Sequence, residues 1–199
     1  MTRRMTSRMP RSVLVIAAAA TVILAGCGLD RGFHGVAVDP PRLMPTFEFR
    51  RGDGSAYRTN AEAKRPMLVF FGYTHCPDVC PTTMADWQRV KQALGDEAAR
   101  VRFVFVSIDP ERDTPQVADR YAQQFDATFV GLSGDSATTA RIQEAFGVAS
   151  VREPDTRASG YLVSHSSQVF LVDDTGRLVA LYAFGRGWDA LLADVKQLL

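Results

Sequence analysis

The sequence predicts an α/β fold in which a central mixed sheet is flanked by helices. Residues 67–73 and 101–108 are two continuous apolar runs, as expected of buried central strands. Each run is followed by a segment whose apolar residues recur at helical spacing, and the chain ends in a hairpin and another such helix. With 199 residues and 46% hydrophobic content, the chain can form one compact domain with tails.

A β-hairpin is predicted at the start of the domain. Phe47 and Phe49 alternate with charged residues, residues 52–54 have the sequence of a turn, and a second short strand follows near Tyr57. The later elements, in chain order, are a helix over 82–94 that Pro81 begins, a helix from Pro115 capped by Thr114, a short strand over 128–132, a helix from Asp135 or Ser136 to Phe146, strands over 169–172 and 178–184, and a C-terminal helix from Trp188. This order, with a cysteine pair just before a helix, is that of a thioredoxin-like fold.

The first 26 residues differ from the rest of the chain. Arginines precede an apolar run over 13–25, which is shorter than the roughly 20 residues that a membrane-spanning helix needs. This pattern predicts a signal peptide over 1–26, with an uncleaved membrane anchor as the alternative. The junction LAGC at 24–27 looks like a bacterial lipobox, so we expect cleavage before Cys27 and attachment of lipid to its thiol.

Three regions are therefore expected. They are a lipoprotein signal peptide over 1–26, a tether over 27–45 that contains glycine and proline, and a thioredoxin-like domain over 46–199. The lipid would hold the protein at the cell membrane, with the domain on the extracytoplasmic side. A net charge of +1 gives no electrostatic basis for binding nucleic acid.

The segment FFGYTHCPDVCP, residues 70–81, contains Cys76 and Cys80. The predicted compartment permits a disulfide between them, but so small a loop would add little stability. A chemical role is therefore the stronger interpretation. A helix N-terminus stabilises the thiolate, which attacks disulfides and binds metals, and residues four apart share one helix face. The two thiols are expected to bind one ion together or to form a redox disulfide.

A histidine would supply a third donor. His34 lies in the predicted tether, where we expect it to be solvated. His75 adjoins Cys76 and is expected to point the opposite way. His165 lies in an otherwise apolar run that enters a strand, and in a thioredoxin-like fold this segment faces the cysteine loop. From the residues alone, His165 is either a ligand or an ordinary strand histidine.

Three motifs in this order resemble those of the Sco/SenC family: GYTHCPDVCPTTM, SIDPERDTPQ, and a histidine shortly before VFLVDDTG. The resemblance covers residues 45–199. It implies a thioredoxin-like domain on a membrane anchor, binding copper as Cu(I) and Cu(II) through Cys76, Cys80 and His165. It also implies a metallochaperone role in assembling the binuclear copper centre of cytochrome c oxidase. The implied partners are the copper-bearing subunit of the oxidase and other copper or thiol carriers.

The alternative function is an extracytoplasmic thiol–disulfide oxidoreductase that reduces the cysteines of the oxidase copper site, so whether the protein is an enzyme stays open. The C-x-x-x-C spacing and the lack of proline after Pro154 favour metal binding over general disulfide exchange. Zinc also accepts two Cys and one His, but soft thiolates select Cu(I) and imidazole suits both copper states. A thiol peroxidase is disfavoured because the P-x-x-x-T-x-x-C pattern is absent.

Ser164 stands where the family usually has Asp directly before the histidine. A carboxylate there would orient the imidazole, so its absence bears on how strongly Cu(II) is held. Asp78, inside the cysteine loop, is expected to cap a turn. A charged loop follows the second central strand and contains Asp109, Arg112 and Asp113. We expect this loop on the face of the domain that carries the cysteines, where it either pairs internally or meets a partner protein.

Overall fold

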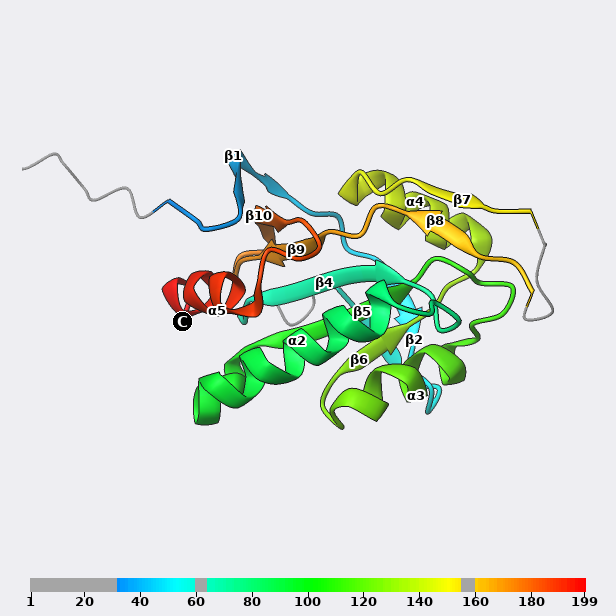
Figure 1. Cartoon of the computed structure of the whole chain (residues 1–199), viewed down its shortest axis with the longest axis horizontal. Helices are drawn as coiled ribbons and strands as arrows, with labels where there is room; N and C mark the ends of the chain where they lie inside the picture. The colour runs from blue at the N-terminus through cyan, green and yellow to red at the C-terminus, as the bar shows by residue number, and fades with distance from the viewer. Residues whose placement is uncertain (1–31, 60–63, 155–159) are drawn as a thin grey trace, which may run out of the picture. The chain divides into compact units, whose positions relative to one another are not determined.

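The predicted α/β architecture is seen in a computed structural model that describes residues 32–59, 64–154 and 160–199 (Figure 1). The strands are β1 (Val36–Leu43), β2 (Glu48–Arg50), β3 (Ala56–Arg58), β4 (Met67–Gly72), β5 (Arg102–Ser107), β6 (Val130–Leu132), β7 (Ser150–Arg152), β8 (Val163–His165), β9 (Val169–Val172) and β10 (Arg177–Tyr182). The helices are α2 (Val79–Leu94), the 3₁₀ helix η2 (Gly95–Arg100), α3 (Pro115–Phe125), α4 (Ser136–Phe146) and α5 (Trp188–Gln197).

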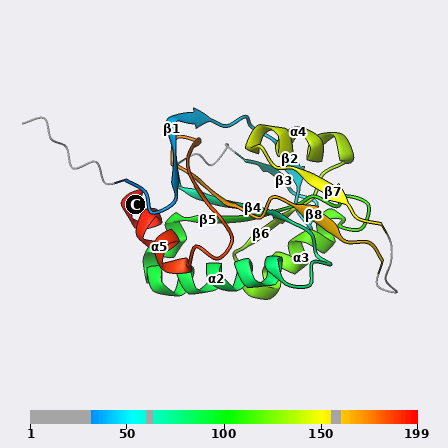
Figure 2. The ribbon, with the colours of Figure 1, turned by 45° about the horizontal axis from the view of Figure 1, so that its top comes forward.

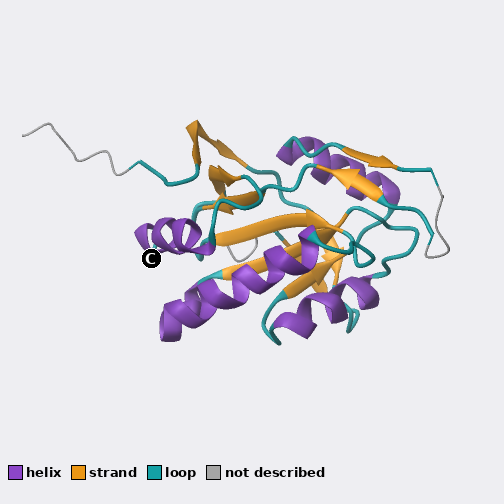
Figure 3. Ribbon diagram, in the orientation of Figure 1, coloured by secondary structure: helices purple, strands orange, loops and turns teal. Residues whose placement is uncertain are grey.

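The main sheet, whose strands are among those drawn in orange in Figure 3, has the strand order β1-β10-β9-β4-β5-β6. The pairs β4–β5 and β5–β6 are parallel, whereas β4–β9, β9–β10 and β1–β10 are antiparallel, so the sheet is mixed as predicted. Every residue of β4 and β5 is buried, as their continuous apolar sequences indicate.

Helices cover both faces of this sheet (Figure 2). Successive side chains of β4 point to opposite faces, so Phe70 and Phe71 enter different clusters of the core. The cluster around Phe70 includes Trp87 of α2 and buried residues of α3 and α5, and the cluster around Phe71 includes Phe146 of α4 and the β2–β3 hairpin. The loop from β4 to α2 therefore lies where a buried strand meets the helix layer.

The predicted hairpin and helix caps are confirmed. In the hairpin, Phe49 of β2 pairs with Tyr57 of β3. Thr114 accepts a hydrogen bond from the Val117 N–H at 3.3 Å at the start of α3, and the Asp135 carboxylate accepts one from the Thr138 N–H at 2.6 Å at the start of α4. These side chains satisfy backbone donors that the helices leave unpaired.

The structure differs from the predicted tether. Residues 36–43 form β1, which pairs with β10 at the sheet edge with an irregular register around its two prolines. His34, which was expected to be solvated, has a side-chain partner, because its Nδ1 lies 2.7 Å from the carboxylate of Asp194. Most β1 side chains are exposed, so the strand is held by backbone hydrogen bonds and shows no apolar periodicity.

The predicted signal peptide and Cys27 lie outside the described residues. Within those residues, no helix is both long enough and apolar enough to cross a membrane.

Candidate metal and redox site

The two cysteines lie where β4 leads into α2. Gly72 ends β4, Cys76 lies in the loop, and Cys80 is in the first turn of α2. Both are free thiols, with Cys76 partly exposed and Cys80 fully buried. The Cys76 N–H donates to the Tyr73 carbonyl at 3.2 Å, and the Cys80 N–H donates to Cys76 Sγ at 3.4 Å. The Cys76 sulfur thus lies at a helix N-terminus, which favours its thiolate.

The two thiols differ in how readily they ionise. A hydrogen bond from the Cys80 thiol lowers the pKa of Cys76 to about 4, with further help from the backbone N–H groups of Asp78 and Cys80, while burial opposes the shift. Donating that bond, being buried and facing the Cys76 thiolate all raise the pKa of Cys80. At neutral pH Cys76 is therefore a thiolate, whereas Cys80 keeps its proton until a metal ion or an oxidant displaces it.

His165 reaches this pair from β8. The short sheet of β7 and β8, which the sequence did not predict, pairs His165 with Ser150. The imidazole Nδ1 lies 2.9 Å from the Ser166 carbonyl, and Nε2 lies 4.0 Å from Cys80 Sγ. A carbonyl can only accept, so Nδ1 carries the proton and the Nε2 lone pair is directed to the sulfur. The ring also packs edge-on against Phe70 and Tyr73.

One donor pair, Cys80 and His165, is already close enough to share a metal ion. Metal–sulfur and metal–nitrogen bonds of about 2.3 and 2.0 Å let two donors of one ion lie up to about 4.3 Å apart. The separation of 4.0 Å between Cys80 Sγ and His165 Nε2 is inside this limit. In the described parts of the chain, no three His, Cys, Asp or Glu side chains already surround one point as ligands. Binding would therefore require some adjustment of the side chains of Cys76, Cys80 and His165.

The structure gives other partners to the remaining candidates. His75 is exposed, with Nδ1 3.2 Å from Thr74 Oγ1 and 3.9 Å from the Asp113 carboxylate. The prediction that Asp78 caps a turn through its side chain is wrong: it occupies the N-cap position of α2 without a capping side-chain bond, and only its backbone carbonyl bonds to the helix, accepting from the Thr82 N–H at 3.2 Å. An open groove of about 310 Å³ runs along Cys76, Glu153 and His165, so the site is accessible from solvent.

The charged loop pairs internally, one of the two options that the sequence left open. The Arg112 guanidinium bonds to the Asp109 carboxylate at 2.5 Å and to the Tyr161 carbonyl at 2.9 Å. Asp109 also accepts from the Tyr161 hydroxyl at 2.7 Å, and burial together with this bond raises the pKa of Tyr161 to about 12. Sequence reasoning missed Tyr161, although an aromatic residue at the start of the segment that carries a candidate ligand was a usable signal.

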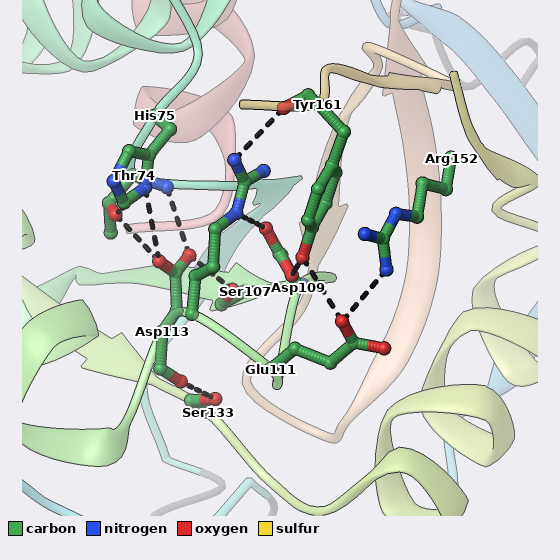
Figure 4. Close-up of polar contacts among 10 residues, drawn as sticks. Thr74, His75, Ser107, Asp109, Glu111, Asp113, Ser133, Arg152 and Tyr161 are labelled. Carbon is green, nitrogen blue, oxygen red and sulfur yellow. Dashed lines mark hydrogen bonds and ion pairs between the residues drawn. The ribbon is translucent and has the colours of Figure 1, made fainter. Parts of the chain in front are cut away.

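The second charged anchor is Asp113, which Figure 4 shows beside Thr74, His75 and Ser107. Its fully buried carboxylate accepts from the Thr74 N–H at 2.9 Å, the Thr74 hydroxyl at 2.6 Å and the Ser107 hydroxyl at 2.6 Å. Its backbone carbonyl accepts from the Ser133 hydroxyl. Asp113 therefore connects the cysteine loop with the ends of β5 and β6.

The protein is therefore a thioredoxin-like domain that brings two thiols of the β4–α2 junction next to one imidazole of β8. The sequence model of the SCO1/SenC family matches residues 36–199. The chain therefore belongs to the SCO1/SenC family.

Individual proteins agree with this assignment. A relative from Stutzerimonas stutzeri, named provisionally as a copper-binding protein, is 32% identical over 174 residues, which cover 84% of each chain. The structure of Bradyrhizobium japonicum ScoI with copper bound is 36% identical, with a TM-score of 0.71, and the match covers 79% of this chain and 99% of that one. The structure of BsSco, described as having a disulfide switch and as a member of the Sco family of cytochrome c oxidase assembly proteins, is 25% identical with a TM-score of 0.63, covering 79% of this chain and 94% of that one.

Proposed function

We propose that this protein binds copper through Cys76, Cys80 and His165 and assists assembly of the copper centre of cytochrome c oxidase. The observation that carries the proposal is the orientation of His165. Its Nδ1 is engaged by a backbone carbonyl, which leaves Nε2 directed to the Cys80 sulfur at 4.0 Å. A bond from Nδ1 to a carbonyl is also the usual support of a metal-ligating imidazole.

The donor set agrees with copper in both oxidation states. Two thiolates provide the soft sulfur ligands that select Cu(I), and the imidazole adds a nitrogen donor suited to Cu(II) as well. Cys76 is already ionised at neutral pH, so binding needs to displace only the Cys80 proton. The open groove beside the pair would admit a protein partner that receives the ion.

The role in oxidase assembly is supported by family membership and by the description of BsSco as a cytochrome c oxidase assembly protein. We further propose that the copper-bearing subunit of the oxidase is the partner. Lipid attachment at Cys27 would hold the domain at the extracytoplasmic membrane surface, a proposal supported by the LAGC junction after a short apolar run.

Metal analysis of the reduced full chain, purified anaerobically in detergent, tests the ligand assignment. We expect one copper ion per chain, and loss of Cu(I) binding when either cysteine is replaced by serine. His165→Ala should weaken Cu(II) far more than Cu(I), because two thiolates can still hold Cu(I), and should remove nitrogen coupling from the Cu(II) paramagnetic resonance spectrum. His75→Ala is the matched control. The ligand assignment would be overturned if His75→Ala, and not His165→Ala, abolished Cu(II) binding.

A second candidate function is thiol–disulfide exchange, favoured by the ionised and partly exposed Cys76 next to a buried, protonated Cys80. In this reaction, the Cys76 thiolate would attack a partner disulfide and release one partner thiolate, which takes up a proton. Cys80 would then lose its proton, attack the mixed disulfide and release the second partner thiol. Cys80→Ser should trap the mixed disulfide with an oxidised peptide that carries two cysteines, whereas a copper chaperone without reductase activity would leave that peptide oxidised.

A further inference from the structure

The segment that leads to the two cysteines and the segment that leads to His165 both form hydrogen bonds with neighbouring residues of one loop. This loop, residues 109–113, connects β5 with α3 and has the sequence DPERD. Asp113 contacts the segment that leads to the cysteines, and Arg112 contacts the segment that leads to His165.

The contact with the cysteine segment is made by a carboxylate. Asp113 accepts both the backbone N–H and the hydroxyl of Thr74, which is two residues before Cys76. A carboxylate that is fully removed from solvent is expensive unless it is well hydrogen-bonded, and here three donors compensate it. Thr74 is therefore held in position against the end of β5.

The contact with the histidine segment is made by Arg112. Its guanidinium lies 3.6 Å from the centre of the Tyr161 ring and also donates to the Tyr161 carbonyl at 2.9 Å. Arg152 stacks on the same ring, likewise at 3.6 Å, and Figure 4 shows it bonding to Glu111. Tyr161 is 8% exposed and lies two residues before β8, which ends at His165.

The loop itself is internally braced. The Asp113 N–H bonds to the Asp109 carbonyl at 2.9 Å, and the Arg112 guanidinium bonds to the Asp109 carboxylate. Arg112 also lies 5.6 Å from the centre of the Tyr73 ring, which packs edge-on against His165. A movement of either ligand segment would therefore have to break contacts with the same short piece of chain.

We propose that Arg112 and Asp113 are positioning residues that set the separation between the cysteine sulfurs and the His165 imidazole. The inference rests on the proposed copper site but concerns residues that do not touch the metal. Asp113 acts on the thiol side of the site and Arg112 on the imidazole side. We therefore expect substitutions of the two residues to lower the affinities for Cu(I) and Cu(II) to different extents.

The experiment compares Arg112→Lys and Asp113→Asn in the reduced full chain. Arg112→Lys keeps the charge but loses the planar group that bonds to Asp109 and Tyr161 at the same time. It should lower Cu(II) affinity by about 10- to 100-fold while changing Cu(I) affinity less than about threefold. Asp113→Asn cannot accept from every donor that faces the carboxylate, and it should lower affinity for both states by about 10-fold or more.

Two matched variants control for simple destabilisation. Asp119→Asn removes another buried carboxylate, which bonds to Arg51 and to backbone N–H groups of Gly52 and Gly131. Arg120→Lys changes an exposed arginine of α3. Both controls should keep wild-type copper affinities, including Asp119→Asn, which we expect to unfold more easily. If Asp113→Asn does not fold, Thr74→Val removes one of the same hydrogen bonds and keeps the carboxylate.

Amide hydrogen exchange of the copper-free protein provides a readout that is independent of metal. Arg112→Lys should speed exchange at residues 163–165, and Asp113→Asn or Thr74→Val at residues 74–76, with the controls unchanged there. The inference is refuted if the variants lower stability but leave both the exchange rates of these segments and the copper affinities unchanged, as we expect for Asp119→Asn. If wild-type protein bound no copper, the proposed function would fail, and the exchange data would still decide whether the loop positions the two segments.

Discussion

Gly72→Ala should disturb the site through a single added methyl group. An ideal Cβ on Gly72 would lie 2.6 Å from Cys80 Sγ, and 3.0 and 3.1 Å from carbons of Phe105 and Phe70. Normal contacts need about 3.5–4.0 Å, so the sulfur would have to retreat by about 1 Å among fully buried neighbours. Overpacking costs about 1–3 kcal/mol, and the change from Gly to Ala in a strand returns about 0.5–1 kcal/mol. We expect the free energy of unfolding to fall by about 1–2 kcal/mol.

The same displacement should weaken copper binding, because a ligand must be held within about 0.5 Å of its working position. We expect a loss of Cu(I) affinity of about 10-fold. Urea unfolding of the reduced protein and a competitive Cu(I) titration measure the two effects. Gly32→Ala is the control, because a Cβ at Gly32 would meet nothing within 4 Å. Wild-type stability together with wild-type copper affinity in Gly72→Ala would refute the reasoning, since it would mean that the buried sulfur moves freely.

Two further predictions concern lipid attachment at Cys27 and the ionisation of Cys76. Cys27→Ser should leave the precursor unprocessed or release the protein from membranes, as fractionation and mass spectrometry of the N-terminus would show; a processed wild-type protein found in the soluble fraction would contradict the lipid anchor. In the reduced protein, iodoacetamide should modify Cys76 and spare Cys80, at a rate that stays constant as pH falls from 8 to 6 and drops only near the Cys76 pKa of about 4. In the unfolded chain, the rate should instead fall as soon as the pH drops below the ordinary thiol pKa of about 8.5. Between the two pKa values, the unfolded thiol binds a proton that the folded Cys76 does not bind. The free energy of unfolding of the reduced protein should therefore rise as the pH rises from the lower pKa to the higher one.

The parts of the fold that were predictable are those in which local sequence and burial agree. The continuous apolar run of β4 is buried throughout, and α2 follows it at the spacing that its apolar residues indicate. Thr114 and Asp135 cap their helices because short side-chain oxygens can reach the first free N–H groups. The place of the cysteine pair after β4 followed from these elements, but the helix start did not: α2 begins at Val79 rather than at Pro81, so Cys80 lies within its first turn.

The parts that were not predictable depend on contacts between distant segments. Asp194 of α5 accepts from the Gly35 N–H at 3.0 Å and lies next to His34, about 160 positions away, and no local pattern marks that pairing. The strands β7 and β8 have three residues each and expose most of their side chains, so they leave little periodic signal. The residues alone therefore left His165 open between a ligand and a strand histidine, and the bond between its Nδ1 and the Ser166 carbonyl could not be foreseen.

Ser164 replaces the aspartate that the family usually carries, and its position determines what Ser164→Asp should do. Ser164 is exposed and pairs with Val151, while successive residues of a strand point to opposite faces. The orienting bond that a carboxylate would give His165 is already made by the Ser166 carbonyl at 2.9 Å.

We therefore expect Ser164→Asp to change Cu(II) affinity less than about threefold and to leave nitrogen coupling in the paramagnetic resonance spectrum unchanged. Ser164→Asn separates the effect of charge from that of size. A gain of about 10-fold or more with Asp but not with Asn would contradict this expectation. It would mean that the carboxylate either reaches the ion or takes Nδ1 from the Ser166 carbonyl, and that this chain holds Cu(II) more weakly than it would with aspartate at position 164.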